Sequence, residues 1–129
     1  MFGNNRVKAL DAKAANGSGI VIRGEEYKDC NFSVSTASSA NLKLSVQISD
    51  NEACPDFDSA AAVDNEWDYL QVFDAENGDI IDGDTGIVYS GTDAVRNFVT
   101  NSNNFRWINF KVSSYVAGAV TVNVKLFNR

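Results

Sequence analysis

The sequence contains no histidine, one proline and two cysteines among its 129 residues. Without histidine, the chain cannot build a Ser-His-Asp triad or a Cys-His pair. Zinc sites that use histidine are also excluded, and two cysteines cannot supply a site of four thiolates. The histidine-dependent hydrolytic and zinc chemistries therefore have no residues to carry them in this chain.

Long apolar runs are missing as well, so the sequence predicts no membrane-spanning helix. Residues 1–6 show no apolar run behind a basic segment, and we therefore expect no signal peptide and synthesis in a reducing cytoplasm. In that compartment two thiols such as Cys30 and Cys54 are usually free, and the sequence leaves a disulfide between them as the alternative. Neither has a histidine to activate it as a nucleophile.

Sequence motifs of the common cofactor and nucleotide sites are also absent. The chain has no P-loop, no G-x-G-x-x-G, no G-x-S-x-G and no H-E-x-x-H. Its composition, 44% hydrophobic and 22% charged, is that of an ordinary globular protein, and its length suits one domain. We expect a non-enzymatic domain without a cofactor.

The strongest positive signal is the alternation of apolar and polar residues. It is unbroken over Leu42–Ser49 and again over Val120–Leu126, which predicts strands with one buried face. Roughly eight such strands, without βαβ alternation, predict an all-β fold, an antiparallel β-sandwich or jelly roll. We assign residues 19–129 to this single domain. Shorter strand-like runs occur at 19–23, 32–36, 67–73, 80–81, 87–90, 94–99 and 105–112.

Three segments depart from this pattern. Residues 1–18 are predicted to form an N-terminal arm or a short helix, although a strand at Val7–Ala15 fits equally well. Residues 114–118 are predicted to be the turn of a closing β-hairpin. The Asp50–Glu66 connection lacks two-residue periodicity, and loops of that length are often functional or lie at an interface.

Charge is divided unevenly along the chain. Residues 44–94 contain thirteen acidic residues and no Lys or Arg. The formal charge is therefore +2 before this stretch, −13 within it and +5 after it, with a total of −6. An acidic total argues against general nucleic-acid binding. The acidic loops either keep the protein soluble or meet a basic surface on another copy or on a partner.

The acidic turns also raise the possibility of a calcium site. Asp79, Asp82 and Asp84 follow closely on Asp74 and Glu76, and hard cations prefer oxygen ligands. Their spacing does not match an EF-hand loop, and Asp-Gly pairs are common in hairpin turns. We therefore expect no specific metal site.

The aromatic residues allow a second alternative. Trp67 and Tyr69 share one face of a predicted strand, and Phe105 and Trp107 share one face of another. Aromatic residues in a sandwich usually fill the core. On an exposed face they could instead stack sugar rings, as in a carbohydrate-binding or adhesion module.

Three segments in order carry a family resemblance. They are the alternating Ser33–Ser49, the W-D-Y-L-Q-V run of Trp67–Val72 with its acidic turn, and the closing R-W-I-N-F-K-V to V-T-V-N-V-K-L stretch of Arg106–Leu126. Together they resemble small bacteriophage virion proteins with a jelly-roll or β-sandwich fold. Capsid decoration (cement) proteins are the nearest group, with small tail or neck proteins behind them.

The resemblance implies a structural role without catalysis. Such proteins assemble as trimers or at symmetry axes of the capsid lattice, on the capsid surface of the virion, and they clamp neighbouring capsomers of the major capsid protein; a homotrimer of this chain is the favoured expectation. Nucleic acid and membranes are not implied as partners. Their termini often form arms that reach the shell or a neighbouring copy, and in this chain the matching residues are Phe2, Arg6 and Lys8.

Overall fold

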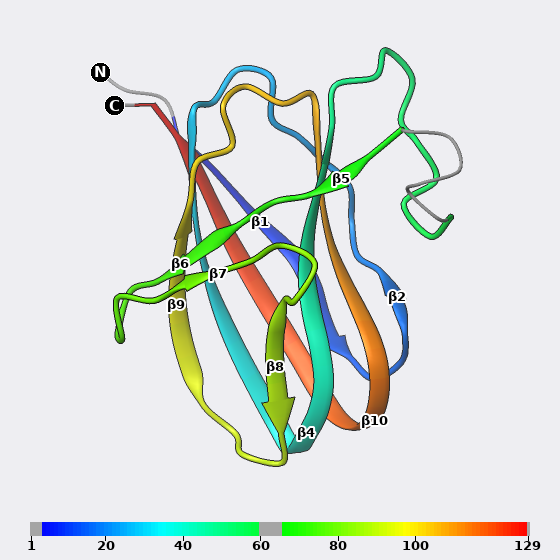
Figure 1. The fold of residues 1–129 in the computed structure, drawn as a ribbon, viewed down its shortest axis with the longest axis vertical. Coiled ribbons are helices and arrows are strands. Elements are labelled where there is room, and N and C mark those ends of the chain that lie inside the picture. The colour runs from blue at the N-terminus through cyan, green and yellow to red at the C-terminus, as the bar shows by residue number, and fades with distance from the viewer. Residues whose placement is uncertain (1–3, 60–65, 129) are drawn as a thin grey trace.

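The computed structural model describes residues 4–59 and 66–128, which form strands and no helix (Figure 1). No helix in this part of the chain is therefore available to cross a membrane. The strands are β1 (Asn4–Lys13), β2 (Gly17–Ser18), β3 (Ile22–Arg23), β4 (Asp29–Ser49), β5 (Asp68–Tyr69), β6 (Val72–Asp74), β7 (Ile80–Ile81), β8 (Ile87–Ser90), β9 (Val95–Thr100) and β10 (Trp107–Phe127).

Two strands of 21 residues, β4 and β10, organise the fold. They pair antiparallel along most of their length, and both turn back at the bottom of Figure 1. The ribbon that they form is thereby folded into two layers. The first layer has the strand order β1-β10-β4-β9-β6-β7. In the second layer, β2 and β3 pair with the other half of β10, while β5 and β8 pair with the other half of β4.

The core lies between these layers. Phe32 of the first layer meets Phe110 of the second edge to face, with ring centroids 5.0 Å apart. The alternating positions of Val120–Leu126 point their apolar side chains into this core, and so do those of Leu42–Ile48. The predicted all-β, antiparallel sandwich-like fold and its core faces are therefore confirmed.

The predicted hairpin turn at residues 114–118 is wrong, because β10 runs through it. Its two halves do not pair with each other, and each pairs with a different half of β4. The register shifts at the corner between Ser113 and Ala119. Gly118 has a φ of 86° there, and a Cβ atom on it would lie 2.4 Å from the Cα of Ala40. A glycine between two segments of alternating apolar and polar residues is compatible with a bend within one strand as well as with a turn between two strands.

The N-terminal segment is a strand of the sheet, which differs from the expected arm or short helix. Residues Asn4–Lys13 form β1 and pair antiparallel with β10. Val7 lies opposite Val124, and Leu10 is buried in the core. Helix formers in so short a segment cannot hold a helix alone, whereas pairing satisfies the open edge of β10.

An ion-pair cluster fixes the outer strands of the first layer. Arg96 of β9 lies 2.6 Å from Asp74 of β6 and 2.9 Å from Glu76. Burial alone would raise the pKa of Asp74, but backbone N–H bonds from Glu76 and Asn77 and the Arg96 guanidinium together hold it below its ordinary value of 3.8. The carboxylate form is thus favoured by folding.

We expect Asp74→Asn to destabilise the fold in a pH-dependent way. A carboxyl whose pKa is lowered by folding stabilises the protein above its unfolded pKa, and this contribution is lost as the pH falls through its folded pKa. The free energy of unfolding of D74N should therefore be lower than that of the wild type at pH 7. The difference should shrink below about pH 4. Urea unfolding at pH 3 to 7 measures it, and a difference independent of pH would contradict the assignment.

Candidate protein-docking face

The outer surface of the first layer carries one continuous row of side chains across six strands. Opposite residues of antiparallel strands share a face, so the pairing register determines which side chains become neighbours. The row runs through Arg6, Lys125, Asn31, Val99, Phe73 and Ile80. It is cationic at the β1 edge of the sheet and apolar at the β7 edge.

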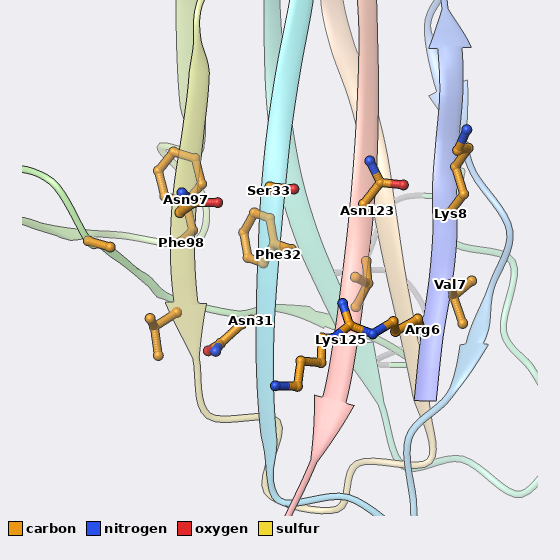
Figure 2. Close-up of a pocket in the computed structure, with 13 residues that line it drawn as sticks. Arg6, Val7, Lys8, Asn31, Phe32, Ser33, Asn97, Phe98, Asn123 and Lys125 are labelled. Carbon is orange, nitrogen blue, oxygen red and sulfur yellow. The ribbon is translucent and has the colours of Figure 1, made fainter. Parts of the chain in front are cut away.

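A second row lies beside it and is polar throughout. It consists of Lys8, Asn123, Ser33 and Asn97, on β1, β10, β4 and β9. Both rows, apart from Phe73 and Ile80, line an open hollow of about 570 Å³, and no acidic side chain is among its lining residues. Figure 2 shows the cations on β1 and β10 and the amides beside them. We call the two rows together the amphipathic face.

The positive charge of this face is largely uncompensated. Among the described residues, no carboxylate forms an ion pair with Arg6 or Lys125, and Lys8 is 4.0 Å from the exposed Asp11. An exposed pair at that distance contributes little. Lys13, Lys28 and Lys43 likewise form no ion pair within the described part of the chain, whereas Arg96 pairs closely with Asp74. What distinguishes this side of a chain of net charge −6 is that three cations line one hollow without an acidic side chain among them, while Asp29 lines the adjoining hollow.

The apolar half of the face is open to solvent. Phe73 is 42% exposed and Ile80 is 65% exposed, although both side chains are large. They line a second hollow of about 470 Å³, which shares Val99 with the first. Adjoining apolar and charged surface is typical of an interface with another protein.

Acidic residues gather at the opposite edge of the sheet from the cations. Asp79, Asp82 and Asp84 are exposed and lie in or next to the β6–β7 ribbon, which we define as residues 72–84. Asp84 also accepts a hydrogen bond from Lys43 through its backbone oxygen. In the part of the chain that the structure describes, no group of three or more acidic or cysteine side chains is arranged to hold a metal ion.

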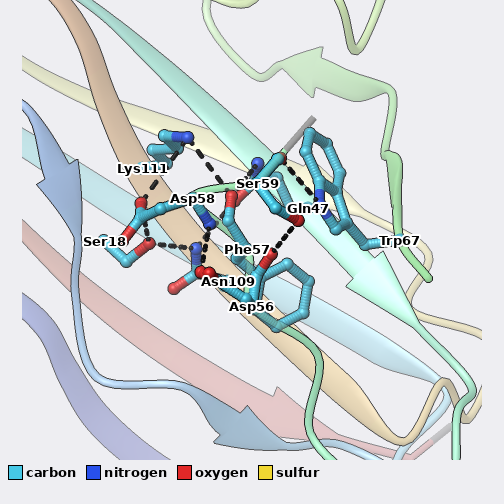
Figure 3. Close-up of polar contacts among 9 residues, drawn as sticks. All are labelled: Ser18, Gln47, Asp56, Phe57, Asp58, Ser59, Trp67, Asn109 and Lys111. Atoms are coloured by element: carbon cyan, nitrogen blue, oxygen red, sulfur yellow. Dashed lines mark hydrogen bonds and ion pairs between the residues drawn. The ribbon is translucent and has the colours of Figure 1, made fainter. Parts of the chain in front are cut away.

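The long connection lies over the outer face of the second layer. Its residues 50–59 cover strand positions that the alternation assigns to solvent, and Ser45, Gln47 and Asn109 are buried there. Gln47 donates through Nε2 to the carbonyl oxygen of Phe57, 3.1 Å away. This connection is therefore packed against polar groups, as Figure 3 shows.

Hydrogen bonds join the connection to both long strands. Asn109 donates to the Oε1 atom of Gln47 at 2.7 Å and to the hydroxyl of Ser18 at 3.0 Å. Lys111 donates to the carbonyl oxygen of Phe57 at 3.2 Å and lies 3.5 Å from Asp58. These contacts connect β2, β4, β10 and the connection into one polar network.

The two tryptophans singled out in the sequence have contacts within the chain. Trp67 is 7% exposed and donates its indole N–H to the carbonyl of Ser59. Trp107 packs against Arg23, whose guanidinium carbon lies 5.1 Å from the centroid of the Trp107 ring.

Both cysteines are free thiols. Burial raises the pKa of the Cys30 thiol to about 12, so that it stays protonated. Cys54 is exposed.

Comparisons with known proteins add a likeness in fold. No family model matches the sequence, and no curated protein matches it. The structure is similar to the crystal structure of the SPBc2 prophage-derived protein YomS, with a TM-score of 0.71 and 11% sequence identity. The match covers 98% of this chain and 95% of that protein. At this identity the likeness shows a shared fold over the whole chain.

Two of the three residues expected to bind a partner lie on the amphipathic face. The structure brings Arg6 and Lys8 together with Lys125, which the sequence did not single out, and partner binding by these residues stays a prediction. Phe2 lies outside the described residues. The alternation of β10 already pointed Asn123 and Lys125 outward, but only the pairing register shows that they adjoin β1.

Proposed function

We propose that this protein is a non-enzymatic structural protein of a bacteriophage virion and that it decorates the capsid. The amphipathic face is the observation that carries the proposal. It lies on the outer surface of neighbouring strands and is open to solvent, which suits contact with another protein better than enclosure of a small substrate. Its cations and its exposed apolar residues lie on strands joined in one continuous order, β1-β10-β4-β9-β6-β7.

The likeness in fold to a prophage-derived protein supports a phage origin. The resemblance of the closing strand to decoration proteins supports the more specific role. In this proposal the protein is made in the host cytoplasm and ends on the outer surface of the shell. The major capsid protein and further copies of this chain are its partners, and no cofactor takes part.

Binding to empty shells of the same phage tests the role directly. Purified protein is mixed with shells that lack it, and co-sedimentation measures the bound amount. We expect saturable binding at a fixed ratio to the major capsid protein and a higher temperature of shell disruption. Shells of an unrelated phage are the control. Absence of binding, together with recovery of the protein only in purified tails, would overturn decoration in favour of a tail or neck component.

A further inference from the structure

We propose that the cationic half of the amphipathic face binds the acidic β6–β7 ribbon of a second copy of this chain, so that copies associate head to tail. The inference rests on the proposal that this face docks a protein, and it names that protein. Two surfaces take part, the cations of β1 and β10 in one copy and the residues around Asp79 and Asp82 in the next.

Charge complementarity is the first argument. The hollow is lined by Arg6, Lys8 and Lys125 without any acidic side chain, and Arg6 and Lys125 form no ion pair within the described part of the chain. Asp79 and Asp82 are exposed, and no side-chain ion pair joins either to a described cation. Each surface thus lacks the charge that the other supplies, and such patches steer and orient association.

The geometry of the sheet is the second argument. The β1 and β7 strands are the two ends of the first layer, separated by four other strands. At about 4.8 Å per strand the two edges lie roughly 24 Å apart on the same sheet. The ribbon therefore cannot reach the cations of its own copy, whereas the ribbon of another copy can.

Apolar burial is the third argument. The ribbon carries Ile80 between its acidic residues, and Ile80 and its neighbour Phe73 are exposed in the single chain. Docking the ribbon on another copy would remove this apolar surface from water. It would also pair the acidic residues of the ribbon with the cations of β1 and β10. The terminal strands of a sheet also retain unpaired backbone N–H and C=O groups, which favour association with another chain.

The two surfaces differ, so the contact is not self-complementary. A head-to-tail contact of this kind continues from copy to copy, and it closes into a ring when the rotation between neighbours allows. The expected species are thus assemblies of several copies, closed into a ring or continued as an open chain.

The molar mass in solution, measured by light scattering behind gel filtration, tests this contact without any capsid. We expect the wild type to exceed its single-chain mass of 14.0 kDa. The triple variant Arg6→Glu, Lys8→Glu, Lys125→Glu should fall to the single-chain mass. The double variant Asp79→Lys, Asp82→Lys should do the same. Circular dichroism and thermal unfolding confirm that both variants are folded.

The decisive variant combines both sets of substitutions in one chain. Because the two surfaces exchange their charges, this variant should recover the wild-type molar mass if they touch each other. The matched controls are Lys28→Glu and Glu52→Lys, which reverse exposed charges outside both surfaces and should leave the mass unchanged.

Three results would overturn the proposal: a wild type that is a single chain at all concentrations tested, reversal variants that keep the wild-type mass, or a combined variant that stays a single chain. The shell-binding experiment above is independent of these. If the protein forms assemblies in solution but does not bind shells, only the decoration role is refuted. If it stays a single chain in solution but binds shells, only the head-to-tail contact is refuted.

Discussion

Replacing Gly118 with alanine is expected to lower the free energy of unfolding by about 3 kcal/mol, the combined cost of a strained backbone and an overpacked corner. The φ of Gly118 is 86°, which an L-residue with a side chain adopts only at a cost. The added Cβ atom would also lie 2.4 Å from the Cα of Ala40 and 2.8 Å from the carbonyl oxygen of Ala37. Both neighbours are backbone atoms of the adjacent strand and cannot move aside independently.

Gly91→Ala is the matched control for this experiment. The φ of Gly91 is 98°, but nothing lies within 4 Å of the position that its Cβ would take. This variant carries the backbone cost without the clash, so it should lose about 1 to 2 kcal/mol. Urea unfolding of both variants separates the two causes. Equal losses would show that the corner can relax around an added methyl group.

The second large effect is expected in the buried polar network, where Gln47→Leu and Asn109→Leu should each cost about 1 to 3 kcal/mol. Each change removes a hydrogen-bond partner from the other amide. Without Asn109, the buried Oε1 atom of Gln47 loses its donor, and the half-buried hydroxyl of Ser18 loses one partner but still donates to Asp58. Without Gln47, Asn109 loses an acceptor that is completely buried beside it.

The double variant Gln47→Leu, Asn109→Leu should cost less than the sum of the two single variants. Removing both amides eliminates the unpaired amide group that each single substitution creates, whereas Ser18 and Phe57 lose their contacts with the amides in the double variant too. The gap measures the coupling between the two amides. Asn41→Leu, at an exposed position of the same strand β4, is the control and should change stability by about 0.5 kcal/mol at most. Strict additivity would mean that the two amides contribute independently.

This network gives the 50–59 connection its place in the molecule. Its contacts with the second layer include polar ones, from the Phe57 carbonyl and Asp58, and the Phe57 ring is buried against Trp67. Within residues 4–59 and 66–128, no loop is hydrogen-bonded across the hollow on the outer face of the first layer in this way. Both proposals therefore concentrate on the amphipathic face.

Burial of Gln47 and Ser49 was not predictable from their own strand. The alternation of Leu42–Ser49 correctly assigns the leucines, Val46 and Ile48 to the core. It also assigns the polar positions to solvent, which is wrong for Ser45, Gln47 and Ser49. A period of two distinguishes the faces of a strand, but it does not tell whether another segment covers the second face. That cover comes from a connection without periodicity, so only the tertiary structure reveals it.

The sequence by itself determined the all-β class, the inward positions of Val120–Leu126 and the exclusion of histidine chemistry, because each depends on residue types and local spacing. Tertiary structure decided that β4 and β10 each pass through a corner. In β10 a glycine beside alternating residues fits a turn and a bend equally well, and in β4 the corner lies at Ser38 and Ser39, which have positive φ without any glycine to signal it. It also decided that β1 completes the sheet, which places Arg6 beside Lys125. The amphipathic face joins strands distant in sequence, and its row of neighbours exists only through the pairing register.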